Sequence, residues 1–314
     1  MAERLMLLDT PTLYYRAYYG IPESVTAPDG MPVNAVRGTL DFISHLVTAY
    51  RPDRLIATFD ADWRPAFRVA LLPSYKAHRV LDPADTGAAA LDPNVELVPD
   101  TLGPQVPVLE AVLDACGLAR GWAEEFEADD AIAAYAAGHD GPVDVVTGDR
   151  DMFQLVSDAR AVRVLNIARG VSKLEELDDA ALQAKYGVTG GSYADFATLR
   201  GDPSDGLPGV SGVGEKTAAA LITEYSSLTG LLTALDDPAS PLKPAVRKKL
   251  DAARDYLAVA PEVVRVRADA PVTEVDSTLP ITPAHPDLLD ELAERYGLAS
   301  PIKRLTKALA AARA

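Results

Sequence analysis

Nine acidic residues fall in five short segments of the chain, and their carboxylates have the type and spacing needed to bind divalent cations. They are Asp9, Asp60, Glu127, Asp129, Asp130, Asp149, Asp151, Asp202 and Asp205. On a helix, residues three apart share a face, so Glu127 and Asp130 can offer oxygens to one ion. Two carboxylates about 4 Å apart repel by roughly 4 kcal/mol at an effective dielectric near 20. A cluster of this kind therefore needs protons or cations.

The available ligand atoms favour two or more ions of Mg²⁺ or Mn²⁺ over zinc. Cys116 is the only cysteine, and the four histidines lie far apart in the chain. Oxygen ligands without nearby imidazole or thiolate suit hard cations. Paired ions promote hydrolysis of phosphodiester bonds, because one generates hydroxide and the other stabilises the leaving oxygen. Each acid taken alone is equally typical of a helix cap, so the hypothesis depends on their convergence.

A glycine-rich segment at residues 201–217 predicts a site for backbone phosphate. Its candidate DNA-binding residues are Gly212, Val213, Gly214, Lys216 and Thr217. Free N–H groups at the start of a helix can hold a phosphate without reading base sequence. Glu215 breaks the Walker pattern, and the third glycine of a dinucleotide fingerprint is absent. An ordinary helix-entry turn is the alternative interpretation.

Basic and aromatic residues elsewhere suggest further contacts with nucleic acid. Arg247, Lys248 and Lys249 offer phosphate contacts, or form a solvated face. Lys76 and Arg79 belong to a basic stretch near the acids, and we expect them to polarise a scissile phosphate. Tyr14 and Arg16 follow the first aspartate, where an aromatic ring can stack on an unpaired base and a cation can neutralise phosphate. Tyr14 fits a core position equally well.

Short strands that alternate with helices are predicted to position the acids. Apolar runs at 4–9, 54–60 and 143–149 each finish on aspartate and indicate buried strands, and 161–167 indicates another. Helices are expected at 33–50, 105–117, 127–138 and 178–186. This alternation predicts a parallel α/β sheet, with Asp9, Asp60 and Asp149 at the carboxyl edge, where such sheets bind ligands.

The second half of the chain is expected to be mainly helical, beyond a boundary near 187–191. Candidate helices are 193–199, 215–225, 227–235, 244–260 and 286–296, with a strand-like signal only at 263–272. Residues 81–104 contain five acids and no lysine or arginine, which indicates a long excursion.

Composition excludes some classes of protein. The 314 residues, 48% hydrophobic, can bury a large core, which rules out global disorder and suggests about two domains. Apolar stretches fall short of the roughly 18 residues of a membrane span, and residues 1–9 lack a signal-peptide layout. We therefore expect a cytoplasmic protein without a membrane partner. The net charge of −16 opposes nucleic acid at long range, unless cations occupy the acids.

Several motifs together resemble the prokaryotic 5′-nuclease (flap endonuclease) family, which includes the N-terminal 5′-3′ exonuclease domain of bacterial DNA polymerase I. The resemblance covers residues 5–272 in a stand-alone chain. Its specific pieces are Phe59-Asp60 with Phe67-Arg68, Ser74-Tyr75-Lys76-Ala77-His78-Arg79, Phe126-Glu127-Ala128-Asp129-Asp130, Thr147-Gly148-Asp149-Arg150-Asp151, and Gly201-Asp202 through Lys216-Thr217.

The resemblance implies an α/β fold in which a PIN-like parallel-sheet nuclease core (1–188, arch at about 76–104) precedes a mainly helical helix-three-turn-helix DNA-binding domain (189–300) and a basic tail (301–314). It implies a first metal site of Asp9, Asp60, Glu127, Asp129 and Asp130, and a second of Asp149, Asp151, Asp202 and Asp205. It also implies catalytic roles for Lys76, Arg79 and Arg68 near the scissile phosphate, and a K⁺ ion at the hairpin.

The function implied is two-metal cleavage of DNA at 5′ flaps and 5′ ends, including RNA-primed DNA, by a monomer. A catalytically inactive DNA-binding relative and a PIN-type ribonuclease are the alternatives. Thr10 replaces a usual glycine, and Gly206 replaces a usual asparagine, which glycine's tolerance of positive φ allows. The acidic excursion departs from the basic arch of relatives and puts threading of single strands in question.

Overall fold

A six-stranded sheet forms the centre of the computed structural model, which describes residues 2–81 and 95–313. The strand order is β3-β2-β1-β4-β5-β6, with β6 antiparallel to β5 and the other pairs parallel. The strands are β1 (Leu5–Asp9), β2 (Arg54–Thr58), β3 (Ala119–Gly121), β4 (Val143–Thr147), β5 (Val162–Asn166) and β6 (Glu175–Leu177). The expected α/β class is confirmed.

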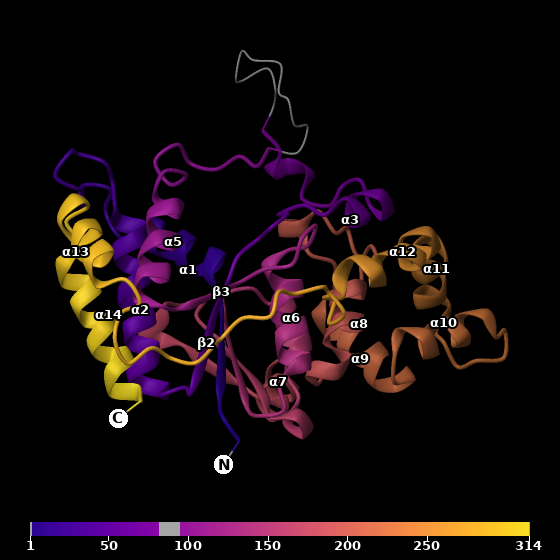
Figure 1. Ribbon diagram of the computed structural model, residues 1–314. Helices are drawn as coiled ribbons and strands as arrows, with labels where there is room; N and C mark the ends of the chain where they lie inside the picture. The colour runs from indigo at the N-terminus through magenta and orange to yellow at the C-terminus, as the bar shows by residue number, and fades with distance from the viewer. Residues whose placement is uncertain (1, 82–94, 314) are drawn as a thin grey trace.

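Both faces of the sheet are covered, as parallel sheets require (Figure 1). On one face, shown at the left of Figure 1, lie α1 (Thr10–Gly20), α2 (Asn34–Tyr50), α5 (Gln105–Cys116), α13 (Pro286–Arg295) and α14 (Ala299–Ala312). On the other face lie α6 (Ala128–Gly138), α7 (Asp179–Tyr186), α8 (Gly190–Arg200) and α9 (Glu215–Tyr225). β1 alternates between the two cores: Leu5 and Leu7 join one, and Met6 and Leu8 join the other.

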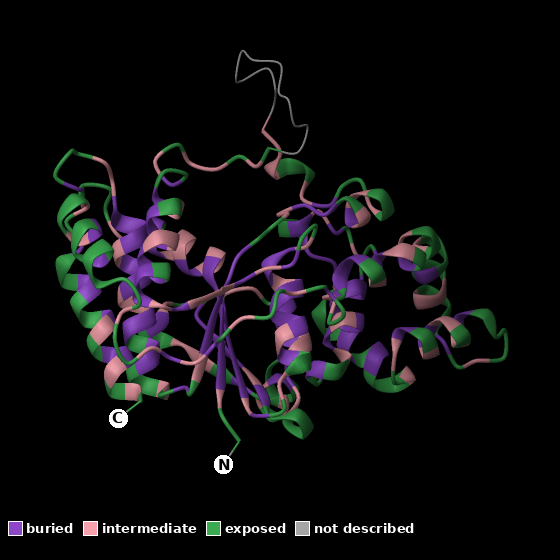
Figure 2. Ribbon diagram, in the orientation of Figure 1, coloured by how far each residue is buried: buried purple, intermediate pink, exposed green. Residues whose placement is uncertain are grey.

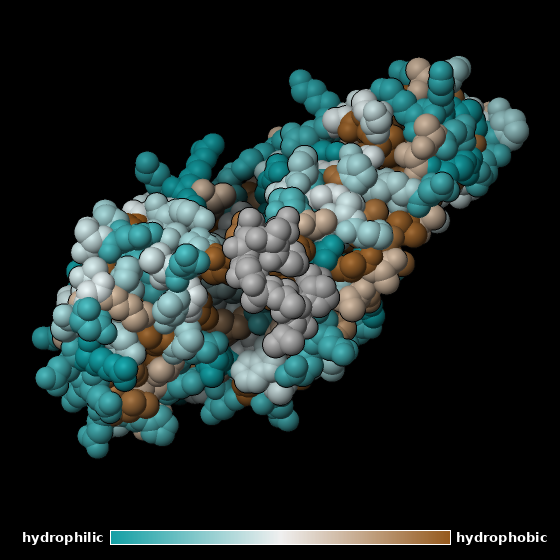
Figure 3. All heavy atoms as spheres, turned by 90° about the horizontal axis from the view of Figure 1, so that it is seen from above, coloured by the Kyte–Doolittle hydropathy of each residue, from teal (hydrophilic) through white to brown (hydrophobic). Residues whose placement is uncertain are grey.

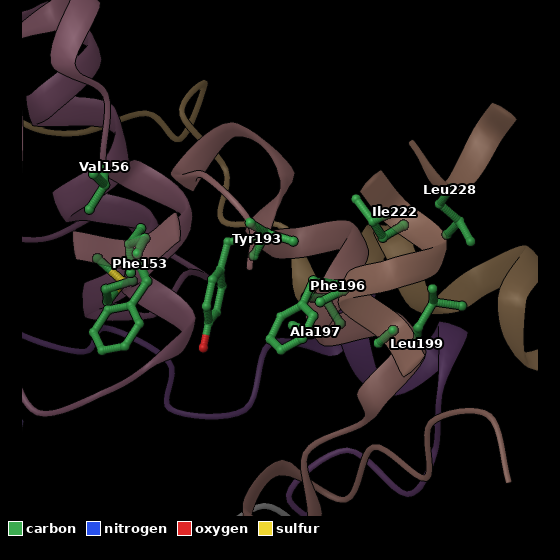
Figure 4. Packing of buried hydrophobic residues seen from close by; sticks show 14 of the residues in the cluster. Phe153, Val156, Tyr193, Phe196, Ala197, Leu199, Ile222 and Leu228 are labelled. Atoms are coloured by element: carbon green, nitrogen blue, oxygen red, sulfur yellow. The ribbon is translucent and has the colours of Figure 1, made fainter. Parts of the chain in front are cut away.

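The helical half extends the second core away from the sheet. Its remaining elements are η5 (Pro203–Asp205), α10 (Leu228–Asp236), α11 (Pro244–Ala252) and α12 (Arg254–Val264). Figure 4 shows Phe153 of η2 (Asp151–Leu155) beside Tyr193 of α8, with ring centroids 5.4 Å apart, and Ile222 of α9 packed further out. Figure 2 shows the same buried interior running from the sheet into these helices. The helical half is therefore fixed to the sheet by hydrophobic packing.

The observed elements differ from the sequence-based expectations in three places. The strands β3 and β6 were not expected, because three residues are too short to show a period. Residues 244–260 form two helices that meet at Ala253. Residues 263–272 form no strand; α12 continues to Val264, and Val272 makes only an isolated bridge with Ala123.

Residues 301–312 of the expected basic tail belong to α14, which is a packed amphipathic helix. Its Ile302, Leu305 and Leu309 are buried in the core that contains α2. Arg304 pairs with Asp41 of α2 at 2.6 Å. The helix α13 packs on α5, and α14 packs on α2. Both C-terminal helices therefore lie on the sheet face that also carries α1, in the first lobe of the molecule. Residues 299–312 of α14 therefore pack with α2, on the sheet, and not with the helices of the second half.

The acidic excursion lies partly outside the described residues, which omit 82–94. The flanking residues are paired: Leu81 N donates to Val95 O at 2.9 Å, and Leu97 N donates to Arg79 O at 2.8 Å. Two more segments precede it, α3 (Ala66–Leu71) and η1 (Ala77–Arg79). No single described helix has the length and hydropathy of a membrane span; the bent pair of α9 and α10 passes by length and composition only.

Candidate active site

A cleft of about 830 Å³ opens at the carboxyl edge of the sheet. The strands β2, β1 and β4 are neighbours, so Asp60, Asp9 and Asp149 emerge side by side, as their sequence positions predict. The N-terminus of α6 adds Glu127 and Asp129. Figure 3 looks down on this edge and shows a largely hydrophilic, elongated surface. Five of the nine predicted acids therefore line one cleft.

Asp9 is held in place by the helix that it caps. Its Oδ1 accepts from Thr12 N at 3.0 Å, and its Oδ2 accepts from the hydroxyls of Thr12 at 2.5 Å and Thr147 at 2.6 Å. Asp9 therefore caps α1 and also lines the cleft. A strand-end aspartate can thus be a helix cap and a candidate metal ligand at the same time. Thr10 is fully buried at the first position of α1.

Asp60 lines the cleft and is exposed to solvent there. Its Oδ1 accepts from Ala128 N, at the start of α6, at 2.8 Å. Desolvation by the surrounding cleft walls raises the pKa of Asp60 from 3.8 to about 7, although Lys76 and this hydrogen bond oppose the change. Burial also raises the pKa of Asp129 well above its ordinary value, and the nearby Asp149 and Asp9 add to this effect. The cleft therefore holds carboxylates that lack sufficient counter-charge.

Glu127 is the exception, because cations already surround it. Its Oε1 accepts from Lys76 Nζ, and its Oε2 accepts from Tyr75 Oη at 2.7 Å and Arg68 Nη1 at 2.6 Å. Burial alone would raise the pKa of Glu127, but Lys76 and Arg68 outweigh it and lower the pKa. Lys76 lies in the left-handed region at φ 48° and also contacts Trp63 O at 3.4 Å. The predicted catalytic lysine thus lines the cleft and neutralises Glu127.

Asp130 and Arg68 do not line the cleft, which corrects their predicted roles. Arg68 binds both oxygens of Asp130, at 2.6 and 2.7 Å, and the two side chains are 3% and 0% exposed. Asp130 Oδ2 also accepts from Glu127 N at 3.3 Å, which closes a capping box on α6. Sequence spacing placed Glu127 and Asp130 on one face, but only Glu127 faces the cleft.

The remaining predicted ligands form a second acidic group beside Asp149. Asp151 is buried, and its Oδ1 has no hydrogen-bond partner within the described residues. Burial, followed by the charges of Asp149 and Asp205, raises the pKa of Asp151 well above its ordinary value. Burial raises the pKa of Asp205 to about 6. Asp202 is better compensated, since its Oδ2 contacts Arg200 at 3.3 Å and Arg150 at 3.4 Å.

The donor set fits a hard divalent cation, although its atoms are spread apart. Within the described ranges, no three His, Cys, Asp or Glu side chains are arranged closely enough to hold one ion. One of the acids, Glu127, is instead paired with Lys76. The buried, unpartnered oxygen of Asp151 and the raised pKa values of Asp129 and Asp149 are features that a bound cation would relieve.

Arg79 and the hairpin join the second acidic group to the cleft. Arg79 Nη2 donates to Ser204 O at 3.0 Å and to Asp205 Oδ1 at 3.2 Å, while its side chain also lines the cleft. Gly206 has φ 72°, and a Cβ there would lie 2.1 Å from Ser74 O. The hairpin packs so closely on this segment that glycine is required at 206 on grounds of space as well as conformation.

The predicted phosphate-binding segment is largely at the surface. Gly212, Gly214, Lys216 and Thr217 are exposed, Val213 is buried, and α9 begins at Glu215 without a side-chain cap. N–H groups at this helix start remain available to an anion.

The basic residues of α11 divide into three roles. Arg247 is a structural cap, because it donates to Ala234 O at 3.3 Å and Asp237 O at 2.9 Å at the end of α10. Lys249 Nζ donates to Gly212 O at 2.7 Å. Lys248 is exposed. A DNA contact by Arg247 stays a prediction, and Lys249 supports the hairpin itself.

Aromatic residues line the far wall of the cleft, but Tyr14 is not among them. Tyr14 packs against the core, whereas Tyr15 and Tyr19 face the cleft with stacked rings 6.5 Å apart. Arg16 also lines the cleft, and its guanidinium donates to Ala168 O. The i, i+4 spacing of Tyr15 and Tyr19, opposite buried Leu13 and Ala17, is the signal that separates them from Tyr14. Trp63 and Glu96 line the cleft without any sequence signal that marked them.

The fold and the acid-lined cleft define an α/β nuclease with an attached helical domain. Residues 4–187 match the family model described as 5′-3′ exonuclease, N-terminal resolvase-like domain, and residues 188–287 match the one described as 5′-3′ exonuclease, C-terminal SAM fold. The chain belongs to the 5′-3′ exonuclease family. The resemblance seen in the sequence is thereby confirmed.

Relatives named as nucleases match over their full length. A 5′-3′ exonuclease of Streptomyces coelicolor is 58% identical over 306 residues, 98% of this chain and 100% of that protein. A 5′-3′ exonuclease of Mycobacterium tuberculosis is 48% identical over 317 residues, 98% of each chain. DNA polymerase I of Mycobacterium bovis is 40% identical over 319 residues, 98% of this chain but 32% of the polymerase. The match to the polymerase is thus confined to one third of it.

Solved structures share the fold at lower identity. The T5 D15 protein co-crystallised with metal ions has a TM-score of 0.62 and 18% identity, covering 99% of this chain and 100% of that one. The catalytic core of Rad2 in complex with DNA substrate has a TM-score of 0.58 and 16% identity, covering 99% and 92%. These likenesses support the two-part architecture over the whole chain.

Proposed function

We propose that the protein is a divalent-metal-dependent nuclease that hydrolyses DNA at 5′ ends and 5′ flaps, including RNA-primed DNA. One observation carries the proposal: carboxylates from three neighbouring strand ends and one helix start line a single cleft. The names of the full-length relatives, 5′-3′ exonuclease, support the polarity of attack. The T5 flap endonuclease and Rad2 complexes with DNA support the substrate class.

Two groups of carboxylates would hold Mg²⁺ or Mn²⁺. The first comprises Asp9, Asp60, Glu127 and Asp129, and the second comprises Asp149, Asp151, Asp202 and Asp205. Bound ions of this kind supply hydroxide at neutral pH and neutralise charge on the leaving oxygen. Asp130 is left out of the first group because both its oxygens bind Arg68.

Side chains of the cleft would bind and orient the phosphate that is cleaved. Lys76 and Arg79 are the cations of the cleft wall nearest the acids, so their ammonium and guanidinium groups can neutralise a phosphate there. Lys76 must first leave Glu127, which exchanges one anionic partner for another. Tyr15 and Tyr19 offer ring faces to the unpaired nucleotides next to this phosphate.

Duplex DNA would dock on the helical half. The N–H groups of Gly214, Glu215 and Lys216 at the start of α9, with the Lys216 side chain, can hold one backbone phosphate, and Lys248 lies on α11 in the same half. A K⁺ ion at the hairpin, a monomeric state and a cytoplasmic location stay predictions. Because Gly212 O accepts from Lys249, a K⁺ ion at that carbonyl would replace an ammonium group already present.

A cleavage assay tests the proposal. End-labelled 5′-flap DNA, the matching nicked duplex and unstructured RNA are incubated with protein in Mg²⁺, Mn²⁺ or EDTA. We expect cleavage of the DNA at its 5′ side only with a divalent ion, and loss of cleavage in Asp149→Asn. Cleavage of RNA but not flap DNA would point instead to a PIN-type ribonuclease. Flap binding without cleavage under any ion would identify an inactive relative.

A further inference from the structure

Arg68 is a buried arginine on α3 whose guanidinium contacts two helix ends at once. At the start of α6, Nη1 binds Glu127 at 2.6 Å and both terminal nitrogens bind Asp130. At the end of α12, Nε donates to Val263 O at 3.0 Å and Nη2 donates to Arg265 O at 3.3 Å. All three guanidinium nitrogens are used, and the side chain is 3% exposed.

Each of these contacts matches a local electrostatic need. The last carbonyls of a helix have no partner within the helix and carry partial negative charge. Arg68 supplies donors and a full positive charge there, while its other edge meets two carboxylates in fork geometry. A lysine has one nitrogen in place of three and cannot reach both helix ends.

The orientation of Glu127 depends on this arrangement. Arg68 and Tyr75 bind Oε2, which leaves Oε1 directed toward Lys76, a residue that lines the cleft. The guanidinium of Arg68 is itself held by Asp130. Asp130 also accepts a hydrogen bond, at 2.8 Å, from the N–H of Arg267, a residue that follows the end of α12. Loss of the fork would free Glu127 to rotate about its side-chain torsions.

We infer that Arg68 is a positioning residue: it fixes the carboxylate of Glu127 in the cleft by anchoring it to the end of α12. It does not itself contact the reacting phosphate, because it lies outside the cleft lining. The same anchor ties the helical half to the acidic site, since α12 also supports α8 through Tyr256 Oη and Thr198 O at 3.0 Å. The inference rests on the proposed function.

The test compares Arg68→Lys with Leu257→Ala, a buried α12 residue with no polar contact to the acids. For Arg68→Lys we expect kcat on flap DNA to fall about 10- to 100-fold with KM for DNA unchanged. Mn²⁺ affinity of the DNA-free protein, measured by electron paramagnetic resonance, should fall several-fold. Leu257→Ala should lower the melting temperature and leave kcat and Mn²⁺ affinity at wild-type values.

A second variant, Asp130→Asn, tests the same inference if the Arg68→Lys protein does not fold. This substitution removes the negative charge of the Asp130–Arg68 ion pair. It should therefore lower kcat and Mn²⁺ affinity, but by smaller factors than Arg68→Lys does. In the double variant the two losses should be less than multiplicative, because the residues act as a unit. Wild-type kcat and Mn²⁺ affinity in a folded Arg68→Lys or Asp130→Asn protein would overturn the inference. An inactive wild-type protein would instead refute the proposed function, and the Mn²⁺ measurement would still decide the role of Arg68.

Discussion

Replacement of Asp60 by asparagine should stabilise the protein when divalent ions are absent. The folded pKa of Asp60, about 7, lies above its ordinary value of 3.8, so ionisation costs stability. The stability given by the protonated acid is complete below the unfolded pKa and is lost as pH rises through the folded pKa. At roughly 1.36 kcal/mol per pKa unit the shift corresponds to about 4 kcal/mol for a fully buried group, and screening by solvent at this exposed side chain reduces it to about 1–2 kcal/mol. The amide oxygen of the substituted side chain would still accept from Ala128 N, without the charge.

The expected change in melting temperature follows from the length of the chain. At roughly 2.1 cal/mol/K per residue over 314 residues, about 1–2 kcal/mol corresponds to a rise of about 2–3 °C. The measurement is calorimetry of wild type and Asp60→Asn in EDTA at pH 8. Asp140→Asn, which removes one exposed surface charge, is the matched control.

The pH and the metal content of the assay show whether the rise in melting temperature comes from the charged cleft or from the change in net charge of the protein. The advantage of Asp60→Asn should shrink at pH 5, where the wild-type carboxyl is protonated in the fold, and again in saturating Mg²⁺, which stabilises the wild type by binding the folded state. A melting temperature at pH 8 in EDTA that is equal to or below wild type would refute the reasoning. So would an equal rise in Asp140→Asn.

Three further outcomes are expected. Asp149→Ala should lower flap turnover about a hundredfold or more while duplex affinity, measured by fluorescence anisotropy, changes little; wild-type turnover would contradict its placement in the metal site. Lys216→Ala or Lys248→Ala should weaken duplex binding and reduce the slope of log K against log salt by about 1, and an unchanged slope would exclude a phosphate contact. Leu305→Ala should cost about 2–5 kcal/mol in denaturant unfolding, with exposed Lys307→Ala as control. A loss no larger than that of the control would show that α14 contributes little.

The cleft was predictable where a side chain follows directly from strand position. Asp9, Asp60 and Asp149 end or follow neighbouring strands, and parallel strands deliver their carboxyl ends to one edge whatever the details of packing. Glu127 follows from the helix start. Asp130 was misplaced because its direction is set by Arg68, whose partners lie 59 to 197 positions away in sequence. Periodicity along a chain contains no information on such distant pairs.

The same limit explains the misassigned residues of the helical half and the C-terminus. A cluster such as Arg247, Lys248 and Lys249 looks uniform in sequence, but each residue points in a different direction around a helix and only Lys248 stays without a backbone partner among the described contacts. The helix α14 alternates lysine and leucine in a way typical of a surface helix, and only the apolar side of α2 reveals where it packs.

The packing of α14 on α2 has a consequence for how this molecule folds. Because α14 packs on α2, a polypeptide interrupted before residue 299 would expose part of the apolar core that these two helices share. Such a fragment would still contain every acid of the cleft, but it would be prone to aggregation and proteolysis. Completion of the lobe that contains the acids thus requires α14, so a product truncated before this helix would tend to aggregate or be degraded rather than accumulate as a folded protein.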